Sequence, residues 1–340
     1  MSVVRTEPVA APSAWRAADL ADRDRWSYDL SAAERHDLER ALEHARAHCT
    51  SMQAMSRDDF PLPLLAPAVD AWLATLQRGR GFVNVRGVPV EGRPLDDCEW
   101  MYWGLGLHLG SAVSQNAAGD LLGHVRDTGA DADDPAVRLY KTRVELGFHS
   151  DGADVVGLLC LRQGKEGGAL RLVSTASLYN ELLRRRADLV PLLYEPFYWD
   201  RNEEQGPGED PYFQLPICHA TDGGVGLFYI PWYIRKAQRH DAVPRMTDAQ
   251  HELLDLIDEV AEDPALHVAM QLEPGEINWL KNNTALHSRT AYVDYDEPAR
   301  KRHLLRLWLQ ARGFDDADPL VSAGIPAKDG VRSDAEDLRD

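Results

Sequence analysis

The sequence lacks several features that would assign it to common classes of protein. It has no run of about eighteen apolar residues, so no membrane-spanning helix is expected. Residues 1–15 contain no continuous apolar core, which argues against a secretory signal peptide. The four cysteines are widely scattered without a Cys-x-x-Cys spacing, so we expect small buried thiols in a reducing cytoplasm, with no disulfide framework or zinc ribbon.

Positive charge is also scarce. The 37 Lys and Arg residues are outnumbered by 55 Asp and Glu residues, which leaves a formal net charge of −18. Nucleic acids and anionic membranes both bind to basic patches, so neither is expected as a partner. A small anionic substrate remains compatible with an acidic exterior, because one buried arginine can bind it locally.

The first part of the chain predicts helices that alternate with strands. Ser31 and Glu34 form a capping-box pattern at the start of an amphipathic helix, and Gly79 has the position of a C-cap after the next one. Residues 1–30 predict irregular packing. The predicted helices are 32–49, 66–78 and 95–108, and the predicted strands are 81–87, 121–126 and 137–142.

Short strands dominate the rest of the chain and favour a sandwich or jelly roll. The type II turn expected at 273–276 and the hairpin turn expected at 222–224 both join such strands. A doubly wound parallel sheet is the alternative, but residues 190–310 lack its regular alternation, and no Gly-x-Ser-x-Gly motif is present. The predicted strands are 155–161, 170–173, 195–199, 212–218, 225–230, 265–272, 276–280 and 303–311, and the predicted helices are 176–186 and 247–262.

A His-x-Asp pair, His149 and Asp151, precedes the apolar strand 155–161. Residues two apart on a strand point to the same face, so both side chains can reach one metal ion. With His287 far downstream they make two imidazoles and one carboxylate, the ligand set of non-haem Fe(II) oxygenases, which leaves positions open on the metal. Each motif alone also has an ordinary interpretation: a surface loop for the pair, and a hydrogen-bonded histidine near a strand end for His287.

Two arginines, Arg302 and Arg306, follow His287 on the next predicted strand. A metal site of this kind commonly binds a keto-acid cosubstrate, whose distal carboxylate needs a fixed and permanently charged partner, and arginine meets both requirements. A structural metal needs no such anchor. The arginines therefore favour an oxygenase over the alternative, a non-catalytic metal-binding protein on a jelly-roll scaffold.

Taken in order, these motifs resemble the taurine dioxygenase and clavaminate synthase superfamily of Fe(II)/2-oxoglutarate oxygenases. The resemblance covers residues 80–312 and implies an α+β fold, with a double-stranded β-helix (jelly-roll) core and flanking and inserted helices. We expect one catalytic domain over 1–340, with a mostly helical part (1–80), the core (81–312) and a loosely ordered tail (313–340). The motifs that carry the resemblance are His149-Ser150-Asp151, Gly167-Gly168, Asn282-Asn283, Leu286-His287-Ser288-Arg289, Arg302 and Arg306.

The resemblance also implies a role for each site residue. His149, Asp151 and His287 would bind Fe(II), and Arg302 would bind the C5 carboxylate of 2-oxoglutarate. Arg306 would face the substrate or the C1 carboxylate, and the sequence leaves open which arginine takes which role. Oxygen and 2-oxoglutarate would react to give succinate and carbon dioxide, and a small-molecule substrate would be hydroxylated or desaturated at an aliphatic C–H bond. Because Asp151 is present, oxygenation is favoured over halogenation, in which a small residue replaces this ligand.

One position departs from the family pattern. Many members place Thr or Ser two residues after the Gly-Gly pair, where it hydrogen-bonds the C5 carboxylate, but this chain has Leu170 there. Either Ser174, Thr175 or another hydroxyl substitutes, or Arg302 acts with fewer helpers.

Three polar residues, together with Arg306, are candidates for contacts with the substrate. Gln115 and Asn116 lie on the loop after the third helix, and Glu145 lies shortly before the His-x-Asp pair; all three suit an amine or amide. Their ordinary interpretations are a turn for the first two and a solvated strand end for Glu145. Arg306 and Glu145 together favour an amino acid or a natural-product acid.

The aromatic segment 229–233 predicts either a lid or pocket wall, or core packing, and Trp279 and Trp308 predict core packing. The sequence leaves open the identity of the substrate, the carbon attacked, and whether the chain forms a homo-oligomer.

Overall fold

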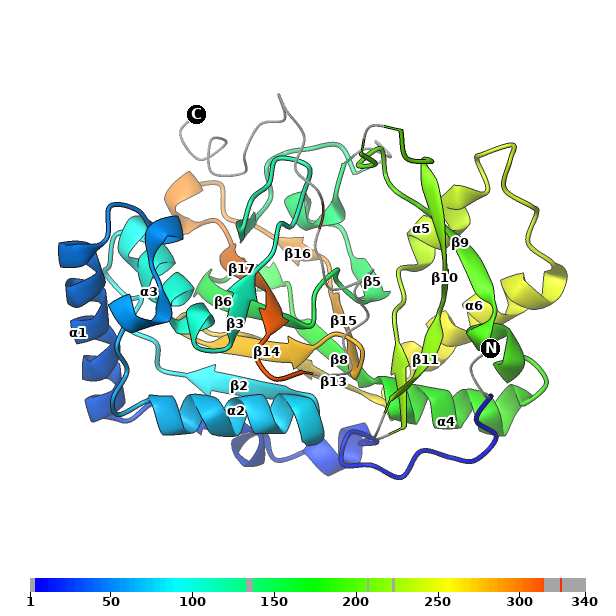
Figure 1. Cartoon of the computed structure of the whole chain (residues 1–340), viewed down its shortest axis with the longest axis horizontal. Helices are drawn as coiled ribbons and strands as arrows, with labels where there is room; N and C mark the ends of the chain where they lie inside the picture. Colours follow the sequence, from blue (N-terminus) through cyan, green and yellow to red (C-terminus); the bar gives the residue numbers. More distant parts are fainter. Residues whose placement is uncertain (1–3, 133–136, 207, 222–223, 315–324, 326–340) are drawn as a thin grey trace.

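The computed structural model describes residues 4–132, 137–206, 208–221, 224–314 and 325 (Figure 1). The α-helices are α1 (Ala32–His48), α2 (Ala66–Arg78), α3 (Leu95–Leu107), α4 (Thr175–Arg186), α5 (Pro231–Ala237) and α6 (Asp248–Ala261). The strands are β1 (Ser27–Asp29), β2 (Phe82–Arg86), β3 (Gly110–Ala112), β4 (Leu122–Val125), β5 (Leu146–His149), β6 (Val155–Arg162), β7 (Glu166–Gly167), β8 (Leu170–Ser174), β9 (Pro196–Asp200), β10 (Tyr212–Pro216), β11 (Cys218–Thr221), β12 (Gly224–Leu227), β13 (His267–Met270), β14 (Ile277–Lys281), β15 (Ala285–Arg289), β16 (Tyr292–Val293) and β17 (His303–Ala311).

Two main sheets form the centre of the molecule. The larger has the order β1-β2-β14-β6-β17-β3, with β4 also paired to β17, and the smaller has the order β13-β8-β15-β5. All pairs in them are antiparallel except β1 with β2. One hydrophobic cluster contains inward side chains of both sheets, so the sheets pack face to face. This arrangement confirms the predicted α+β fold with a jelly-roll core.

Alternation along the strands of the larger sheet determines which side chains face the interior. On β2, Val83 packs with α1, α2 and α3, whereas its neighbour Phe82 packs toward the smaller sheet. On β17, Leu305 packs with the helices, and Trp308 packs between the sheets. Burial of each such side chain stabilises the fold by about 1.5–3 kcal/mol. The same alternation turns Arg306, one residue after Leu305, toward the interior.

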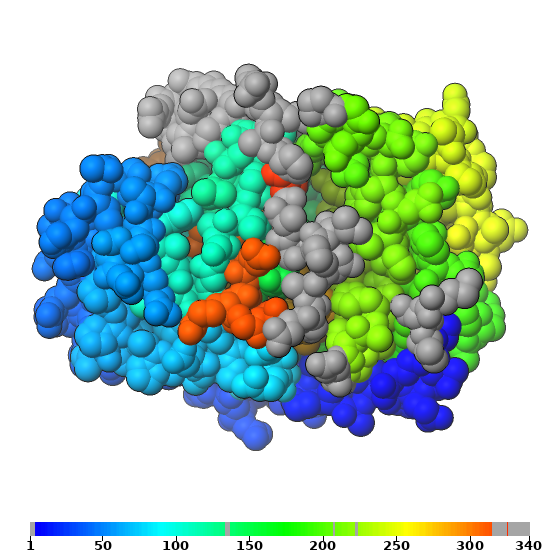
Figure 2. Space-filling model, viewed as in Figure 1, coloured from blue at the N-terminus to red at the C-terminus, as the bar shows by residue number. Residues whose placement is uncertain are grey.

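Helices α4 and α6 cover the outer face of the smaller sheet. Phe148 of β5 and Leu286 of β15 are buried with residues of these helices. The next residue on each strand, His149 and His287, therefore faces the interior between the sheets. Helices α1 and α3 lie at one end of the molecule, and α5 and α6 lie at the other (Figure 1). Figure 2 shows the yellow segment that contains α6 at the end opposite α1.

Most of the predicted helices and strands are present where local sequence signals placed them. The capping box of α1 is formed in both directions between Ser31 and Glu34. The predicted type II turn has Gly275 at a φ of 83° and a 2.9 Å hydrogen bond from the Glu276 amide to the Glu273 carbonyl. A hairpin does join β11 and β12 around the predicted turn, although residues 222–223 lie outside the described part. Its first strand is Cys218–Thr221, however, and not the predicted 212–218, most of which forms β10 and pairs with β9. Most of the tail 313–340 also lies outside it.

Some element predictions were wrong or incomplete. Residues 137–142 contain a short 3₁₀ helix, Leu139–Lys141, in place of a strand. The segment 1–30 is not wholly irregular, because β1 pairs in parallel with β2. Strand β15 and helix α5 were not predicted. Helix α5 starts at Pro231, whose fixed φ suits the first turn of a helix.

The four cysteines are free, and three of them are buried, as expected. None of the helices in the described ranges combines the length and apolar character needed to cross a membrane.

Candidate metal centre and its pocket

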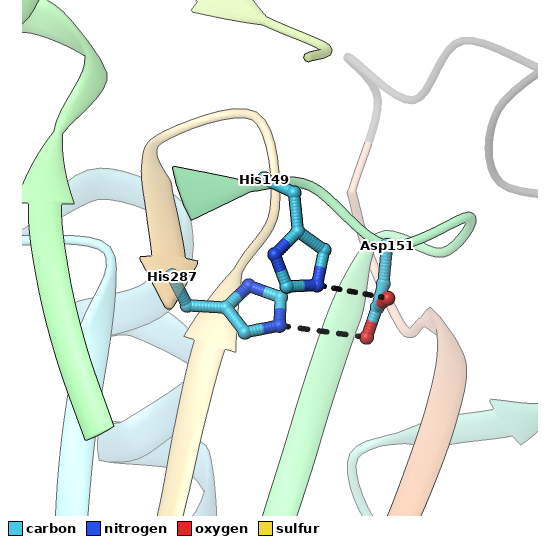
Figure 3. A group of neighbouring side chains, drawn as sticks. All are labelled: His149, Asp151 and His287. Carbon is cyan, nitrogen blue, oxygen red and sulfur yellow. Dashed lines mark ion pairs between the residues drawn. The ribbon is translucent and has the colours of Figure 1, made fainter. Parts of the chain in front are cut away.

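His149, Asp151 and His287 meet at the inner face of the smaller sheet (Figure 3). His149 and His287 are direct partners in the register of β5 and β15, and their ring centroids lie 4.2 Å apart. Asp151 faces both rings, with Oδ1 3.7 Å from Nε2 of His149 and Oδ2 3.6 Å from Nε2 of His287. One potential ligand atom from each residue lies within 4.8 Å of the others. The three side chains are buried and close enough to share one metal ion.

Burial sets the protonation states of these ligands. Burial, followed by the neighbouring His287 ring, lowers the pKa of His149 to about 3, so its imidazole is neutral. Nδ1 of His149 donates to the Gly147 carbonyl at 2.8 Å, which leaves Nε2 with a lone pair for a metal. Burial alone would raise the pKa of Asp151, but Arg306 and the two imidazoles hold it well below its usual range. The carboxylate is therefore ionised.

Side chains from the larger sheet hold Asp151 in place. Nε1 of Trp308 donates to Oδ2 of Asp151 at 2.8 Å, and Nη1 of Arg306 lies 3.5 Å from the same oxygen. Oδ1 of Asn282 accepts a 3.0 Å hydrogen bond from the Asp151 amide. Trp308 lies in the core as predicted, but its polar contact was missed. The available signal was its place two residues after Arg306, on the same face of a strand.

A cavity with about 630 Å³ of empty space, including its open mouth, lies beside the two histidines. Three buried arginines line it: Arg289 at the end of β15, Arg302 just before β17, and Arg306 within β17. Most of the remaining wall is apolar, with Leu158, Leu170 and Leu304 among its residues.

Each of these arginines keeps a guanidinium nitrogen that has no hydrogen-bond partner among the described residues: Nε and Nη1 of Arg289, Nη1 of Arg302 and Nη2 of Arg306. Burial and the charge of Arg302 lower the pKa of Arg289 to about 10, so it is still a cation at neutral pH. A buried charge without a partner costs several kcal/mol. The donor set fits a metal ion, and Arg289 and Arg302, which form no ion pair among the described residues, fit an anionic ligand beside it.

Of the predicted substrate residues, Gln115 is tied to Arg306. Its Oε1 accepts from Nε of Arg306 at 2.7 Å, and its Nε2 donates to the Arg306 carbonyl at 2.8 Å. The side chain of Asn116 instead closes a local turn, because its Oδ1 accepts from the amides of Ala118 and Asp120. The ordinary interpretation therefore holds for Asn116, and Gln115 acts through the arginine.

Two further expectations need correction. The Glu145 carboxylate points away from the cavity and pairs with Nη2 of Arg171 at 2.6 Å, with over half of its side chain exposed. Its neighbour Leu146 lines the cavity instead, as alternation along a strand requires. Ser174 and Thr175, at the start of α4, do not replace the hydroxyl missing at Leu170, because neither lines the cavity and their hydroxyls donate to the carbonyls of Ser13 and Asn283, respectively.

The aromatic segment 229–233 serves both predicted purposes. Tyr229 is fully buried and belongs to the core beneath the smaller sheet. The ring of Trp232, on α5, lies 5.1 Å from the ring of His149. Helix α5 thus provides a wall beside the metal centre.

A model of the "Taurine catabolism dioxygenase TauD, TfdA family" matches residues 41–308. The chain belongs to this family. As a TauD/TfdA protein it is an Fe(II)/2-oxoglutarate-dependent dioxygenase, and the match confirms the family and both cofactors predicted from the sequence.

Relatives support this assignment along most of the chain. FR-33289 synthase of Streptomyces rubellomurinus is 31% identical over 312 residues, 91% of this chain and 92% of the relative. Taurine hydroxylase-like protein SAT17 of Stachybotrys chartarum is 26% identical over 309 residues, 86% of this chain and 77% of the relative.

Solved structures show the same fold. An asparagine oxygenase in complex with Fe(II), 3-hydroxyasparagine and succinate has a TM-score of 0.66 at 18% identity, covering 89% of this chain and 100% of that chain. The non-haem iron oxygenase OrfP with Fe and α-ketoglutaric acid has a TM-score of 0.64 at 15% identity, and the match covers 84% of this chain and 94% of that chain.

Proposed function

We propose that this TauD/TfdA protein couples decarboxylation of 2-oxoglutarate to hydroxylation, or desaturation, of an aliphatic C–H bond in a small organic acid. The observation that carries the proposal is the meeting of His149, Asp151 and His287 beside a cavity lined by three arginines, each of which keeps a guanidinium nitrogen without a hydrogen-bond partner among the described residues. A non-catalytic metal protein has no use for such groups.

The proposal assigns a task to each part of the site. His149, Asp151 and His287 would hold Fe(II), which supplies the oxidising chemistry when bound with 2-oxoglutarate. Trp308 orients the Asp151 carboxylate through its 2.8 Å hydrogen bond. Arg302 would bind the C5 carboxylate of 2-oxoglutarate, at the end of the cavity formed with Gly168. The apolar wall excludes water from the reacting groups.

Arg306 would bind the anionic group of the substrate. Its Nη2 is free of partners among the described residues, and Gln115 fixes the orientation of its guanidinium group through Nε. No carboxylate lines the cavity in the part of the chain that the structure describes, so the acid group of the substrate is the part that these residues would recognise.

Two structural relatives support an amino acid or a natural-product acid as the substrate class. The asparagine oxygenase structure contains 3-hydroxyasparagine, and a structure of OrfP contains (3S)-hydroxy-L-Arg. Both molecules carry a carboxylate and a hydroxylated aliphatic carbon, which supports hydroxylation as the outcome.

A screen for substrate-dependent succinate release over amino acids and organic acids tests the proposal. We expect release above the uncoupled background with one class of acid, and none in His149→Ala. Release that no acid stimulates above background, from enzyme that binds Fe(II) and 2-oxoglutarate, would contradict the proposed substrate class. Equal release from His149→Ala would contradict the site.

A further inference from the structure

We infer that Arg289 is a second cosubstrate-binding arginine, so that two guanidinium groups, those of Arg289 and Arg302, bind the distal carboxylate of 2-oxoglutarate. This inference rests on the proposed function and concerns the end of the cavity that lies away from Asp151.

The strand geometry directs Arg289 into the cavity. It lies two residues after His287 on β15, so both side chains share the inward face, and both line the cavity. The guanidinium carbons of Arg289 and Arg302 each lie 4.9 Å from the ring centroid of Tyr292. Two cations, one at the end of β15 and one just before β17, therefore lie against the same aromatic ring.

Arg306 belongs to the other end of the cavity. Its guanidinium carbon lies 4.6 Å from the ring centroid of Tyr140 and 4.9 Å from that of Trp308, and its Nη1 lies 3.5 Å from Asp151. It is thus next to a metal ligand and already close to a negative charge. Arg289 and Arg302 have no carboxylate partner among the described residues.

An anion bound between Arg289 and Arg302 would neutralise their buried charges. Nη2 of Arg289 donates to the Val144 carbonyl, but its Nε and Nη1 have no partner in the described ranges, nor does Nη1 of Arg302. Two buried cations that share a cavity repel each other, and a carboxylate bound by both removes that repulsion. One ionised carboxylate offers about four lone-pair sites, enough for two guanidinium groups.

Two positions beside these arginines have no polar side chain. Leu170 is the direct register partner of Arg289 on β8 and contributes no polar group to the cavity. Gly168 has a φ of 73°, and a Cβ there would lie 2.9 Å from Nε of Arg302. The glycine thus makes room for the Arg302 guanidinium.

Anaerobic titration of the Fe(II)-loaded protein with 2-oxoglutarate measures the affinity directly, through the visible charge-transfer band of the chelate. We expect Arg289→Gln to raise the Kd by about 10- to 100-fold, as loss of hydrogen bonds to a charged group does. Arg300→Gln is the matched control, because Arg300 is more than half exposed, contacts Glu297 and Tyr295, and does not line the cavity; the Kd of this variant should equal that of the wild type.

A shorter keto acid without a distal carboxylate, 2-oxobutyrate, separates recognition from a structural role. Arg289→Gln should raise the Kd of 2-oxoglutarate and leave the Kd of 2-oxobutyrate unchanged. If the substitution raises both Kd values equally, or raises neither, the inference is overturned.

Arg302→Gln distinguishes this inference from the proposed function. If Arg302→Gln loses affinity for 2-oxoglutarate and Arg289→Gln does not, only the role of Arg289 fails. If Arg289→Gln, Arg302→Gln and His149→Ala all leave the Kd of 2-oxoglutarate unchanged, the proposed function fails together with the inference.

Discussion

The indole nitrogen of Trp308 donates a 2.8 Å hydrogen bond to the carboxylate of Asp151. Trp308 lies on β17 of the larger sheet, whereas Asp151 follows β5 of the smaller one. The contact therefore joins the two sheets at the candidate metal centre. The hydrogen bond also fixes the orientation of the carboxylate toward the two histidines. Hydrogen-bond partners of metal ligands commonly have this role.

Trp308→Phe keeps an aromatic ring in the core and removes this hydrogen bond. We expect the affinity for Fe(II) to fall by about 10- to 100-fold. Isothermal titration with Fe(II) under anaerobic conditions measures it. Trp279→Phe is the matched control, because Trp279 is fully buried on the opposite face of the larger sheet and its indole nitrogen has no partner among the described residues. Equal Fe(II) affinity in both variants would contradict the role of Trp308.

Gln115→Leu removes the side-chain contact that orients Arg306 and keeps a similar volume. The substrate KM should rise by about tenfold, since one hydrogen bond to a charged group is lost. The Kd of 2-oxoglutarate should not change, because Arg302 and Arg289, the arginines proposed to bind that ligand, lie elsewhere in the cavity. A rise in the Kd of 2-oxoglutarate with an unchanged substrate KM would reverse the roles assigned to the arginines.

Glu145→Gln tests the corrected position of Glu145. Its carboxylate pairs with Arg171 on the outside of the smaller sheet, and its side chain is 56% exposed. We expect no change in the substrate KM and a loss of at most about 1 kcal/mol in the free energy of unfolding. A marked rise in KM for an amine-containing substrate would restore the original interpretation of this residue.

Glu99 makes the stability of the protein depend on pH. Burial and the nearby Asp96 raise the pKa of Glu99 from 4.5 to about 7. The Glu99 carboxyl therefore binds its proton more tightly in the folded state than in the unfolded state. The stability gained from this protonation is complete below pH 4.5 and is lost as the pH rises through about 7.

Glu99→Gln removes this dependence. At pH 8 the variant should be more stable than the wild type by about 1 kcal/mol, and the difference should shrink toward pH 5. Urea unfolding at both pH values measures it, with Glu91→Gln as the exposed control. A difference that grows toward pH 5 would contradict the raised pKa.

Local patterns in the sequence predict much of the fold because they act through neighbouring residues. The Ser31 capping box and the inward apolar face of α1 are such patterns. Strand β15 was missed because Ser288 and Arg289 are not typical strand residues; its conformation comes from pairing with β5 and β8, which are distant in sequence.

The same reason divides the site into predictable and unpredictable parts. His149, Asp151 and His287 were recognisable as motifs, because residue types and order carry the signal. The contacts of Trp308 and the direction of Glu145 depend on which face of a strand each side chain occupies. That requires the strand boundaries and the register, which the sequence pattern did not define around 146–149.

The most direct test of the metal centre is the visible charge-transfer band that appears when Fe(II) and 2-oxoglutarate are added together without oxygen. We predict that the wild type forms the band and that His149→Ala and Asp151→Ala do not. His251→Ala, on the exposed face of α6, should behave as the wild type. A band of full intensity in both ligand variants, or no band in the folded wild type, would contradict the assignment of His149, Asp151 and His287 as the iron ligands.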